Sequence, residues 1–309
     1  MSKPTPLCQS PRIRRFSSHV QSLVLFLVAV SWLSACGDSA NAAPVCALTG
    51  EPIATLSSAE AAWAFVEKQQ GTLQATKTSG EVRNIQFDHL PSDLDAIPAR
   101  RIDLFLALVL PSALNVNAAI TEDRNRLTEL SQKSELGVDE KRSLRDLAER
   151  YGLESPSISE LLERVDIIPP SLILAQAADE SGWGRSRFAV EGNALFGQHT
   201  NDSGQPAIAA REGNVRLAAF KTLCGSVEAY VSNLNSTRAY AKLREIRVEL
   251  RKAGKPLSGS ALVAGLTQYS ERGESYQADL RSIIRHHDLE AFDKAHLVGP
   301  SEWARVSQH

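Results

Sequence analysis

The chain has 309 residues, of which 43% are hydrophobic, and its formal net charge at pH 7 is −2. This length and composition fit a soluble globular protein of one or two compact units, with enough apolar residues to fill a core and no visible internal repeat. The slight excess of acidic residues argues against nucleic acid as the main partner.

The first 35 residues are predicted to be a signal peptide. Three arginines at positions 12, 14 and 15 precede an apolar run, residues 23–33, that is too short to span a membrane or to be retained as an anchor. The run ends in Leu-Ser-Ala-Cys36, which resembles a bacterial lipobox. We therefore expect Cys36 to be lipidated and to hold the protein on the periplasmic side of the envelope. An Ala-x-Ala site at 40–42 is the alternative, and cleavage there would give a soluble periplasmic protein.

Removal of residues 1–35 would leave a more acidic chain. Four of the 34 basic residues and none of the 36 acidic residues lie in this segment, so the remaining chain has a formal net charge of −6. Gly37 follows Cys36, at the position where the strongest inner-membrane retention signal has Asp. This difference favours the outer membrane as the place of the anchor.

Cysteine usage leaves one pairing question open. Of the four cysteines, Cys8 lies in the signal peptide and Cys36 is the predicted lipidation site. An oxidising periplasm would allow the remaining two, Cys46 and Cys224, to form a disulfide. Two unpaired thiols are equally compatible with the sequence, because it does not show whether the side chains meet.

Residues 36–56 are predicted to form a linker, because glycines, prolines and short polar residues interrupt every period. The region that follows, residues 57–165, is predicted to be helical. A capping box at 57–60 starts a helix that ends at Gly71, and polar, irregular sequence continues to about residue 92.

Four further helices are expected in this region. The apolar run 101–110 predicts a buried core helix that Pro111 interrupts, with a separate polar helix after it. Asp139 caps a helix whose apolar stripe ends at Gly152. A second capping box at 157–160 opens a short helix that leads to the centre of the chain.

The stretch 169–197 organises the rest of the sequence. Two prolines at its start suit the first turn of a helix, and the Leu, Ile and Ala residues after them continue the helix to Gly182. Glu180 then lies in the last turn, where the partial negative charge of the helix end disfavours a carboxylate. The indole of Trp183 adds an apolar wall. Both effects raise a carboxyl pKa, so Glu180 is a candidate proton donor.

Two sequence patterns in this stretch carry a family resemblance. E-S-G-W-G at 180–184, followed by N-A-L-F-G at 193–197, resembles the glucosaminidase domain of glycoside hydrolase family 73. L-F-L-A-L-V-L-P at 104–111 and V-D-I-I-P at 165–169 resemble the Bax-type proteins that carry this domain. The resemblance implies a mainly α (α+β), lysozyme-like domain over residues 166–292 with a small β-hairpin lobe.

The same resemblance suggests roles for several residues. It implies that Glu180 is the catalytic acid and that Trp183, Asn193 and Phe196 lie along the substrate groove. For the two aromatic residues, a place in the hydrophobic core is an equally open reading. Y-S-x-R-G-x-x-Y at 269–276 resembles the tyrosine pattern near the end of the family's domain.

The resemblance also raises the question of a second catalytic group. Gly-, Asn- and Ser-rich sequence before residue 215 and partial alternation after it predict the hairpin lobe. Glu212 lies in its turn, where related domains have a second Glu, although a solvated turn residue is the alternative. Tyr269 as a catalytic partner and Tyr276 as a substrate-binding residue are the other candidates. The N-acetyl group of the substrate could itself act as nucleophile.

The end of the chain is less distinctive. Helices are expected at 226–233, 240–252 and 277–286, and residues 293–309 are predicted to be a weakly specified tail. His286 and His287 have no third ligand at metal spacing. The phosphate-binding glycine loop and the nucleophile elbow are both absent from the sequence. We therefore expect neither a metal nor another cofactor.

These observations predict a peptidoglycan hydrolase. The expected reaction is cleavage of the β-1,4 bond after N-acetylglucosamine in glycan strands, with Glu180 as general acid. Three alternatives stay open: a lytic transglycosylase, a muramidase, and a non-catalytic lipoprotein that binds peptidoglycan. The sequence leaves the oligomeric state open.

Overall fold

The computed structural model describes residues 45–200, 204–210 and 216–308. The predicted signal peptide and lipidation site Cys36 lie outside these residues, and so does Glu212 in the predicted turn of the hairpin. The predictions made for them are not tested by the fold.

The described chain is mainly helical and has two small sheets, which confirms the predicted fold class. The helices are α1 (Ala59–Gln70), α2 (Leu73–Ser79), α3 (Arg101–Ser131), α4 (Val138–Arg150), α5 (Ile158–Arg164), α6 (Pro170–Ser181), α7 (Arg187–Gly192), α8 (Leu223–Ser236), α9 (Ala241–Lys252), α10 (Gly259–Leu262) and α11 (Glu274–His286). The strands are β1 (Ala54–Leu56), β2 (Glu81–Phe87), β3 (Ala207–Ala209), β4 (Arg216–Ala218) and β5 (His296–Val306), and short 3-10 turns are η1 (Leu94–Ala96), η2 (Arg238–Tyr240), η3 (Val263–Gly265) and η4 (Leu289–Lys294).

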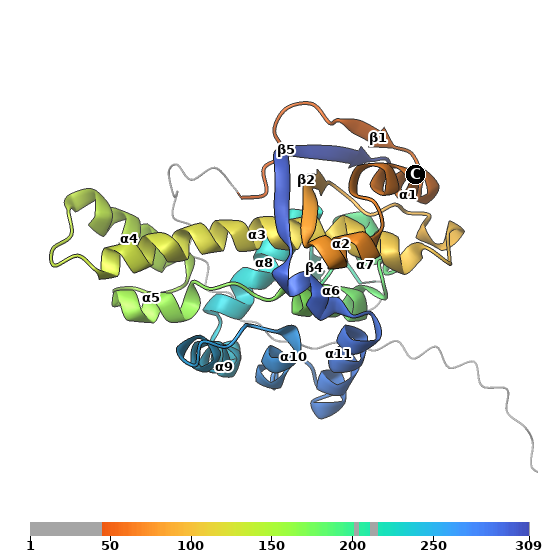
Figure 1. Cartoon of the computed structure of the whole chain (residues 1–309). Helices are drawn as coiled ribbons and strands as arrows, with labels where there is room; N and C mark the ends of the chain where they lie inside the picture. Colours follow the sequence, from red (N-terminus) through yellow and green to blue (C-terminus); the bar gives the residue numbers. More distant parts are fainter. Residues whose placement is uncertain (1–44, 201–203, 211–215, 309) are drawn as a thin grey trace, which may run out of the picture.

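Helix α3 runs through the middle of the molecule, with the three-stranded sheet on one side and α9 to α11 on the other (Figure 1). It is long and apolar enough to cross a membrane, but 78% of its apolar window is buried within the protein. This burial confirms that the apolar run 101–110 belongs to a core helix.

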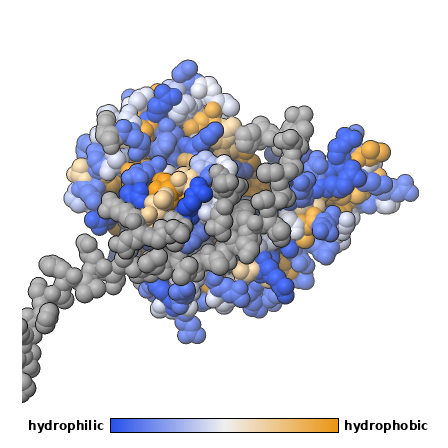
Figure 2. Space-filling view, turned by 180° about the vertical axis from the view of Figure 1, so that it is seen from behind, coloured by the Kyte–Doolittle hydropathy of each residue, from blue (hydrophilic) through white to orange (hydrophobic). Residues whose placement is uncertain are grey.

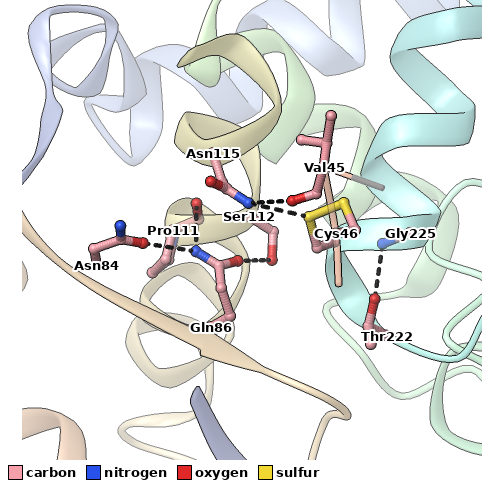
Figure 3. The surroundings of a disulfide bond; sticks show 10 residues. Val45, Cys46, Asn84, Gln86, Pro111, Ser112, Asn115, Thr222 and Gly225 are labelled. Atoms are coloured by element: carbon pink, nitrogen blue, oxygen red, sulfur yellow. Dashed lines mark hydrogen bonds between the residues drawn. A yellow bond between two sulfur atoms is a disulfide. The ribbon is translucent and has the colours of Figure 1, made fainter. Parts of the chain in front are cut away.

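Pro111 does not interrupt α3, contrary to the sequence-based prediction. Proline lacks the N–H that would form one helical hydrogen bond. The packing of α3 against several other elements compensates this loss. The side chain of Gln86 on β2 donates to the Pro111 carbonyl at 3.2 Å and accepts from the Ser112 hydroxyl at 3.3 Å (Figure 3). Tertiary packing therefore overrides the local helix-breaking signal.

The larger sheet is parallel throughout and has the strand order β1-β5-β2. Its central strand, β5, lies in the segment predicted to be a weakly specified tail, and β1 takes up the end of the predicted linker. The irregular sequence before residue 92 forms α2 and β2. These predictions were wrong because each strand finds its partner more than 200 residues away, where no local pattern reveals it.

Helix α6 is enclosed by α3, α10, α11 and η4. Every residue from Ser171 to Ala178 is buried, and the small residues of this helix allow close approach. A side chain at Gly259 on α10 would begin 2.3 Å from the Ser171 hydroxyl. The helix that ends at Glu180 is thus held rigidly in the core.

Strands β3 and β4 pair in antiparallel fashion and form the predicted hairpin lobe. The lobe docks on α7, since the Phe220 N–H donates to the Gly192 carbonyl at 2.8 Å and Arg187 donates to the Ala209 carbonyl at 2.8 Å. Its first strand begins ten residues after the N-A-L-F-G segment, so the lobe follows this segment in the chain.

Cys46 and Cys224 form a disulfide, which answers the pairing question that the sequence left open (Figure 3). It joins the segment before β1 to the first turn of α8. Asn115 on α3 donates to the Val45 carbonyl at 3.0 Å, beside the disulfide, and so ties the same segment to α3 (Figure 3). Among the described residues that are visible on the face opposite that of Figure 1, most are hydrophilic (Figure 2).

Candidate active site

The last turn of α6 carries Glu180 and ends in an uncommon backbone shape. Gly182, Trp183 and Gly184 all adopt positive φ angles of 59°, 60° and 77°. The Trp183 N–H donates to the Ala178 carbonyl at 2.9 Å. The helix therefore ends where the sequence predicted, with Glu180 in its final turn.

The neighbours of Glu180 in E-S-G-W-G shape this turn. The Ser181 hydroxyl donates to the Ala177 carbonyl and accepts from the Gly184 N–H at 2.8 Å. A side chain at Gly184 would begin 2.9 Å from methyl groups of both Leu90 and Leu94, so these two side chains would have to shift to admit a larger residue. Arg101 donates to the carbonyls of the turn from the start of α3. The serine and the last glycine of E-S-G-W-G thus determine the backbone turn that follows Glu180, apart from any role of its carboxyl group.

The carboxyl group of Glu180 is half-buried and its two oxygens have different surroundings. Tyr276 on α11 donates its hydroxyl proton to Oε1 at 2.8 Å. Oε2 faces Gly197 at the end of N-A-L-F-G, where a Cβ would begin 3.9 Å away. One oxygen is therefore engaged, while the other points to the segment that leads into the hairpin lobe.

Burial raises the pKa of Glu180 to about 7, and the hydrogen bond from Tyr276 opposes this shift. The charge of Asp179 raises the same pKa further and that of Arg272 lowers it. A carboxyl group with this pKa is partly protonated at neutral pH, so it can donate a proton to a leaving oxygen.

A buried chain of hydrogen bonds stands behind Tyr276. The amide Nε2 of Gln176 donates to the Tyr276 hydroxyl at 2.9 Å, and the Tyr230 hydroxyl donates to Oε1 of Gln176. Gln176 lies four residues before Glu180, so both side chains share one face of α6. The chain links α8, α6 and α11 at the carboxyl group.

Stacked aromatic rings surround this chain. Tyr269 stacks on Tyr276 with ring centres 5.5 Å apart, and Phe196 stacks on Tyr230 at 4.0 Å. The Tyr269 hydroxyl donates to the Phe196 carbonyl at 3.4 Å. The two tyrosines of Y-S-x-R-G-x-x-Y are thus brought together beside Glu180, one bonded to its carboxyl group and the other to N-A-L-F-G.

Arg272 lies beside Asp179 and Tyr276. Its guanidinium donates to Asp179 and, at 3.0 Å, to Asp279, and it lies 4.9 Å from the centre of the Tyr276 ring. Burial raises the pKa of Asp179 despite this pairing. Arg272 therefore partly compensates the negative charge next to Glu180.

Residues 155–289 match the family model described as Glucosaminidase, mannosyl-glycoprotein endo-beta-N-acetylglucosaminidase. Over 200 residues the chain is 36% identical to protein bax of Escherichia coli strain K12, which covers 62% of this chain and 71% of that protein. The chain belongs to the Bax family of glucosaminidase-domain proteins. The resemblance predicted from its sequence patterns is confirmed.

Two solved structures show partial similarity to this Bax-type chain. The catalytic domain of the autolysin Auto from Listeria monocytogenes is 19% identical and has a TM-score of 0.33, covering 55% of this chain and 96% of that domain. The glycoside hydrolase domain of FlgJ from Salmonella typhimurium is 22% identical with a TM-score of 0.32, covering 47% and 80%.

Two residues predicted to bind substrate, Asn193 and Phe196, are buried. Asn193 is fully buried at the end of α7, where it donates to the carbonyls of Asp88 and Phe220. Its φ of 52° suits asparagine, and this backbone requirement explains its place in N-A-L-F-G. Phe196 is only 3% exposed and belongs to the core, as the alternative reading held.

Trp183 follows the last turn of α6. Its half-buried ring packs edge-on against Phe105 and against His287, with ring centres 5.9 and 4.6 Å apart. Tyr276 contacts the Glu180 carboxyl group through its hydroxyl. A sugar contact by Trp183 stays a prediction.

Sequence reasoning missed several residues of the Bax-type site. Gln176 could have been noticed in the sequence, because it is the one polar residue in the apolar run 172–178. Arg272 could also have been noticed, because it is the charged residue of Y-S-x-R-G-x-x-Y. Tyr230 lies on α8, far away in the sequence, and no local pattern connects it to Glu180.

Within the described parts of the chain, no cluster of three or more His, Cys, Asp or Glu residues could hold a metal ion. The second catalytic group of the glucosaminidase domain stays a prediction, because Glu212 lies outside those parts.

Proposed function

We propose that this Bax-type chain is a peptidoglycan hydrolase, an endo-β-N-acetylglucosaminidase that cleaves the β-1,4 bond after N-acetylglucosamine. The observation that carries the proposal is the half-buried carboxyl group of Glu180, which accepts a hydrogen bond from Tyr276 on one oxygen and whose pKa is raised by burial to about 7. Membership of a glycoside hydrolase family supports the same reaction class.

In the proposed reaction, protonated Glu180 donates its proton to the glycosidic oxygen as the bond to the sugar breaks. The resulting carboxylate keeps the hydrogen bond from Tyr276, which favours the charged form. The positive charge of Arg272 also stabilises this carboxylate. These two groups keep the pKa low enough for proton release.

The proposed second group is Glu212 in the turn of the hairpin lobe, where it would activate water or stabilise the oxocarbenium-like state. The N-acetyl group of the substrate is the competing candidate. Turnover by Glu212→Gln distinguishes them. A loss of at least a hundredfold supports a direct role, whereas a near-normal rate removes Glu212 from the mechanism.

We also propose that the protein is lipidated at Cys36 and held on the periplasmic side of the envelope, with the outer membrane preferred. The proposal rests on Leu-Ser-Ala-Cys36 at the end of the apolar run. Mass spectrometry of the mature N-terminus tests it: an acylated Cys36 is expected, and a soluble product that begins at Ala43 would contradict it.

The central experiment is mass spectrometry of purified peptidoglycan digested by the wild-type protein and by Glu180→Gln. Reducing N-acetylglucosamine ends are expected from the wild type and no products from the variant, because Gln keeps the shape but delivers no proton. Glu271→Gln is the matched control, since Glu271 is an exposed carboxylate of the tyrosine pattern, and it should retain activity.

Other products would identify the alternatives. Reducing N-acetylmuramic acid ends would identify a muramidase, and anhydro ends a lytic transglycosylase. No product from the wild type would leave a peptidoglycan-binding lipoprotein. Normal turnover by Glu180→Gln would contradict the role of Glu180.

A further inference from the structure

The hydrogen-bond chain behind Tyr276 lies entirely inside the protein. Gln176, Tyr230 and Tyr276 are each 0% exposed, and they come from three different helices. Tyr230 donates to Gln176, Gln176 donates to Tyr276, and Tyr276 donates to Glu180. The chain thus has one direction, and it ends on the carboxyl group.

The chemistry of the amide explains this direction. An amide NH₂ only donates and an amide oxygen only accepts, whereas a tyrosine hydroxyl can do either. In the observed direction, every buried O–H of the chain has an acceptor. In the reverse direction, Glu180 would donate to Tyr276 and the chain would end at Tyr230, whose buried O–H would lose its partner. An unpaired buried donor costs about 1–3 kcal/mol, so the observed direction is favoured.

We propose that Gln176 is a positioning residue that fixes this direction, so that the acidic proton of Glu180 resides on Oε2, the oxygen that faces Gly197. The Tyr276 hydroxyl donates to Oε1 and therefore does not accept a hydrogen bond from protonated Glu180. The proton is kept on the oxygen that borders N-A-L-F-G. This inference rests on the proposed role of Glu180 as the acid and identifies which of its oxygens acts.

Other ionisable groups also face Glu180, and the test must not add or remove a charge among them at neutral pH. They are Asp179 on α6, Arg272 with its partner Asp279, Tyr276 on α11, Tyr269 before it, Tyr230 on α8 and Tyr240 in η2. The variants Gln176→Met and Tyr230→Phe add no charge. Each removes one link of the chain and keeps a side chain of similar volume.

The test is the titration of the Glu180 carboxyl, followed by ¹³C NMR and assigned by its absence in Glu180→Gln. Without the amide donor of Gln176, the Tyr276 hydroxyl is a weaker donor to Oε1 of Glu180, so it stabilises the carboxylate less and competes less with a proton on that oxygen. We expect the pKa of Glu180 in Gln176→Met to rise by about one unit, a tenfold change in proton affinity. Tyr230→Phe should raise the pKa of Glu180 by less. It leaves Gln176 in place but removes the donor to its amide oxygen, so the amide group can rotate by 180°.

Turnover of purified peptidoglycan gives the second readout. The alkaline limb of the kcat profile should move to higher pH by the same amount, and the maximum kcat should fall about tenfold because part of the proton lies on Oε1. Tyr240→Phe is the control for loss of a buried hydroxyl. It should titrate and turn over like the wild type, because Tyr240 is not a link of the chain.

The two readouts separate this inference from the proposed function. If the wild type does not cleave peptidoglycan, the function fails while the NMR titration still reports on the chain. If the wild type cleaves but Glu180 titrates identically in the wild type, Gln176→Met and Tyr230→Phe, the positioning role is overturned. Tyr230→Phe, the milder change, keeps the test decisive if Gln176→Met does not fold.

Discussion

Glu180 connects the candidate chemistry of this protein to its stability. Its pKa is about 7 in the folded protein and about 4.5 when exposed. Below pH 4.5 both states are protonated, and between the two values the folded state binds more protons. Stability therefore falls as pH rises from 4.5 to 7, by up to about 3 kcal/mol at roughly 1.4 kcal/mol per unit.

The first prediction follows from this linkage. Glu180→Gln removes the buried charge, so the variant should be more stable than the wild type at pH 8 and similar to it at pH 4. Urea denaturation at the two pH values measures the difference. An equal gain at both would show that the effect does not come from ionisation.

The second prediction concerns the two glycines of E-S-G-W-G. Both have positive φ, but only Gly184 lies against Leu90 and Leu94, while nothing stands within 4 Å of a side chain at Gly182. Gly182→Ala should cost about 1 kcal/mol of unfolding free energy from backbone strain alone. Gly184→Ala should cost at least about 1 kcal/mol more, because overpacking adds to the strain. Equal costs by thermal denaturation would remove the packing argument.

At the scale of elements, the start of α6 depends on a distant residue. Pro169 at its N-cap has no side-chain acceptor. Asp293 on η4 replaces that acceptor, accepting from both the N–H and the hydroxyl of Ser171 at 2.8 Å. The helix that carries Glu180 is therefore capped from the region just before β5.

The third prediction tests this cap. Asp293→Ala should lower the unfolding free energy by about 1–2 kcal/mol, and Asp293→Asn should lose less because an amide oxygen still accepts. Glu245→Ala removes an exposed ion pair with Lys242 and should change stability by less than about 0.5 kcal/mol. If Asp293→Ala resembled this control, Asp293 would not cap α6.

The elements also show what sequence reasoning can reach. Helix α6 and its end were predictable because prolines, small apolar residues and Gly182 are local signals. Strand β5 was not, because its partners β1 and β2 are far away and its own residues include a glycine and a proline. Glu180 and Tyr276 were recognised through family patterns. Tyr230 joins the site only through the packing of α8, which no short pattern encodes.

At the scale of the whole molecule, the disulfide closes most of the chain into one loop. Cys46 and Cys224 are 178 residues apart in the sequence. Restricting so long a loop in the unfolded chain contributes up to about 5 kcal/mol in the chain-entropy model. The glucosaminidase domain is thereby tied to the segment that precedes β1.

The fourth prediction is that the double variant Cys46→Ser, Cys224→Ser unfolds at a lower temperature than the wild type. A loss of about 2–5 kcal/mol is expected, and reducing agent should affect the wild type but not the variant. Peptide mapping without reductant verifies the bridge. Equal melting temperatures of the two proteins under oxidising conditions would contradict the stabilising role.

The place of strand β5 in the sheet also affects the order in which the protein can fold. The strand follows every other described element in the sequence, yet it lies between β1 and β2. A chain that is synthesised or delivered from its N-terminus holds those two strands without a neighbour until its last strand arrives. The sheet is therefore completed late, after the glucosaminidase domain has emerged. Slow release of the final residues would prolong an open, protease-sensitive state.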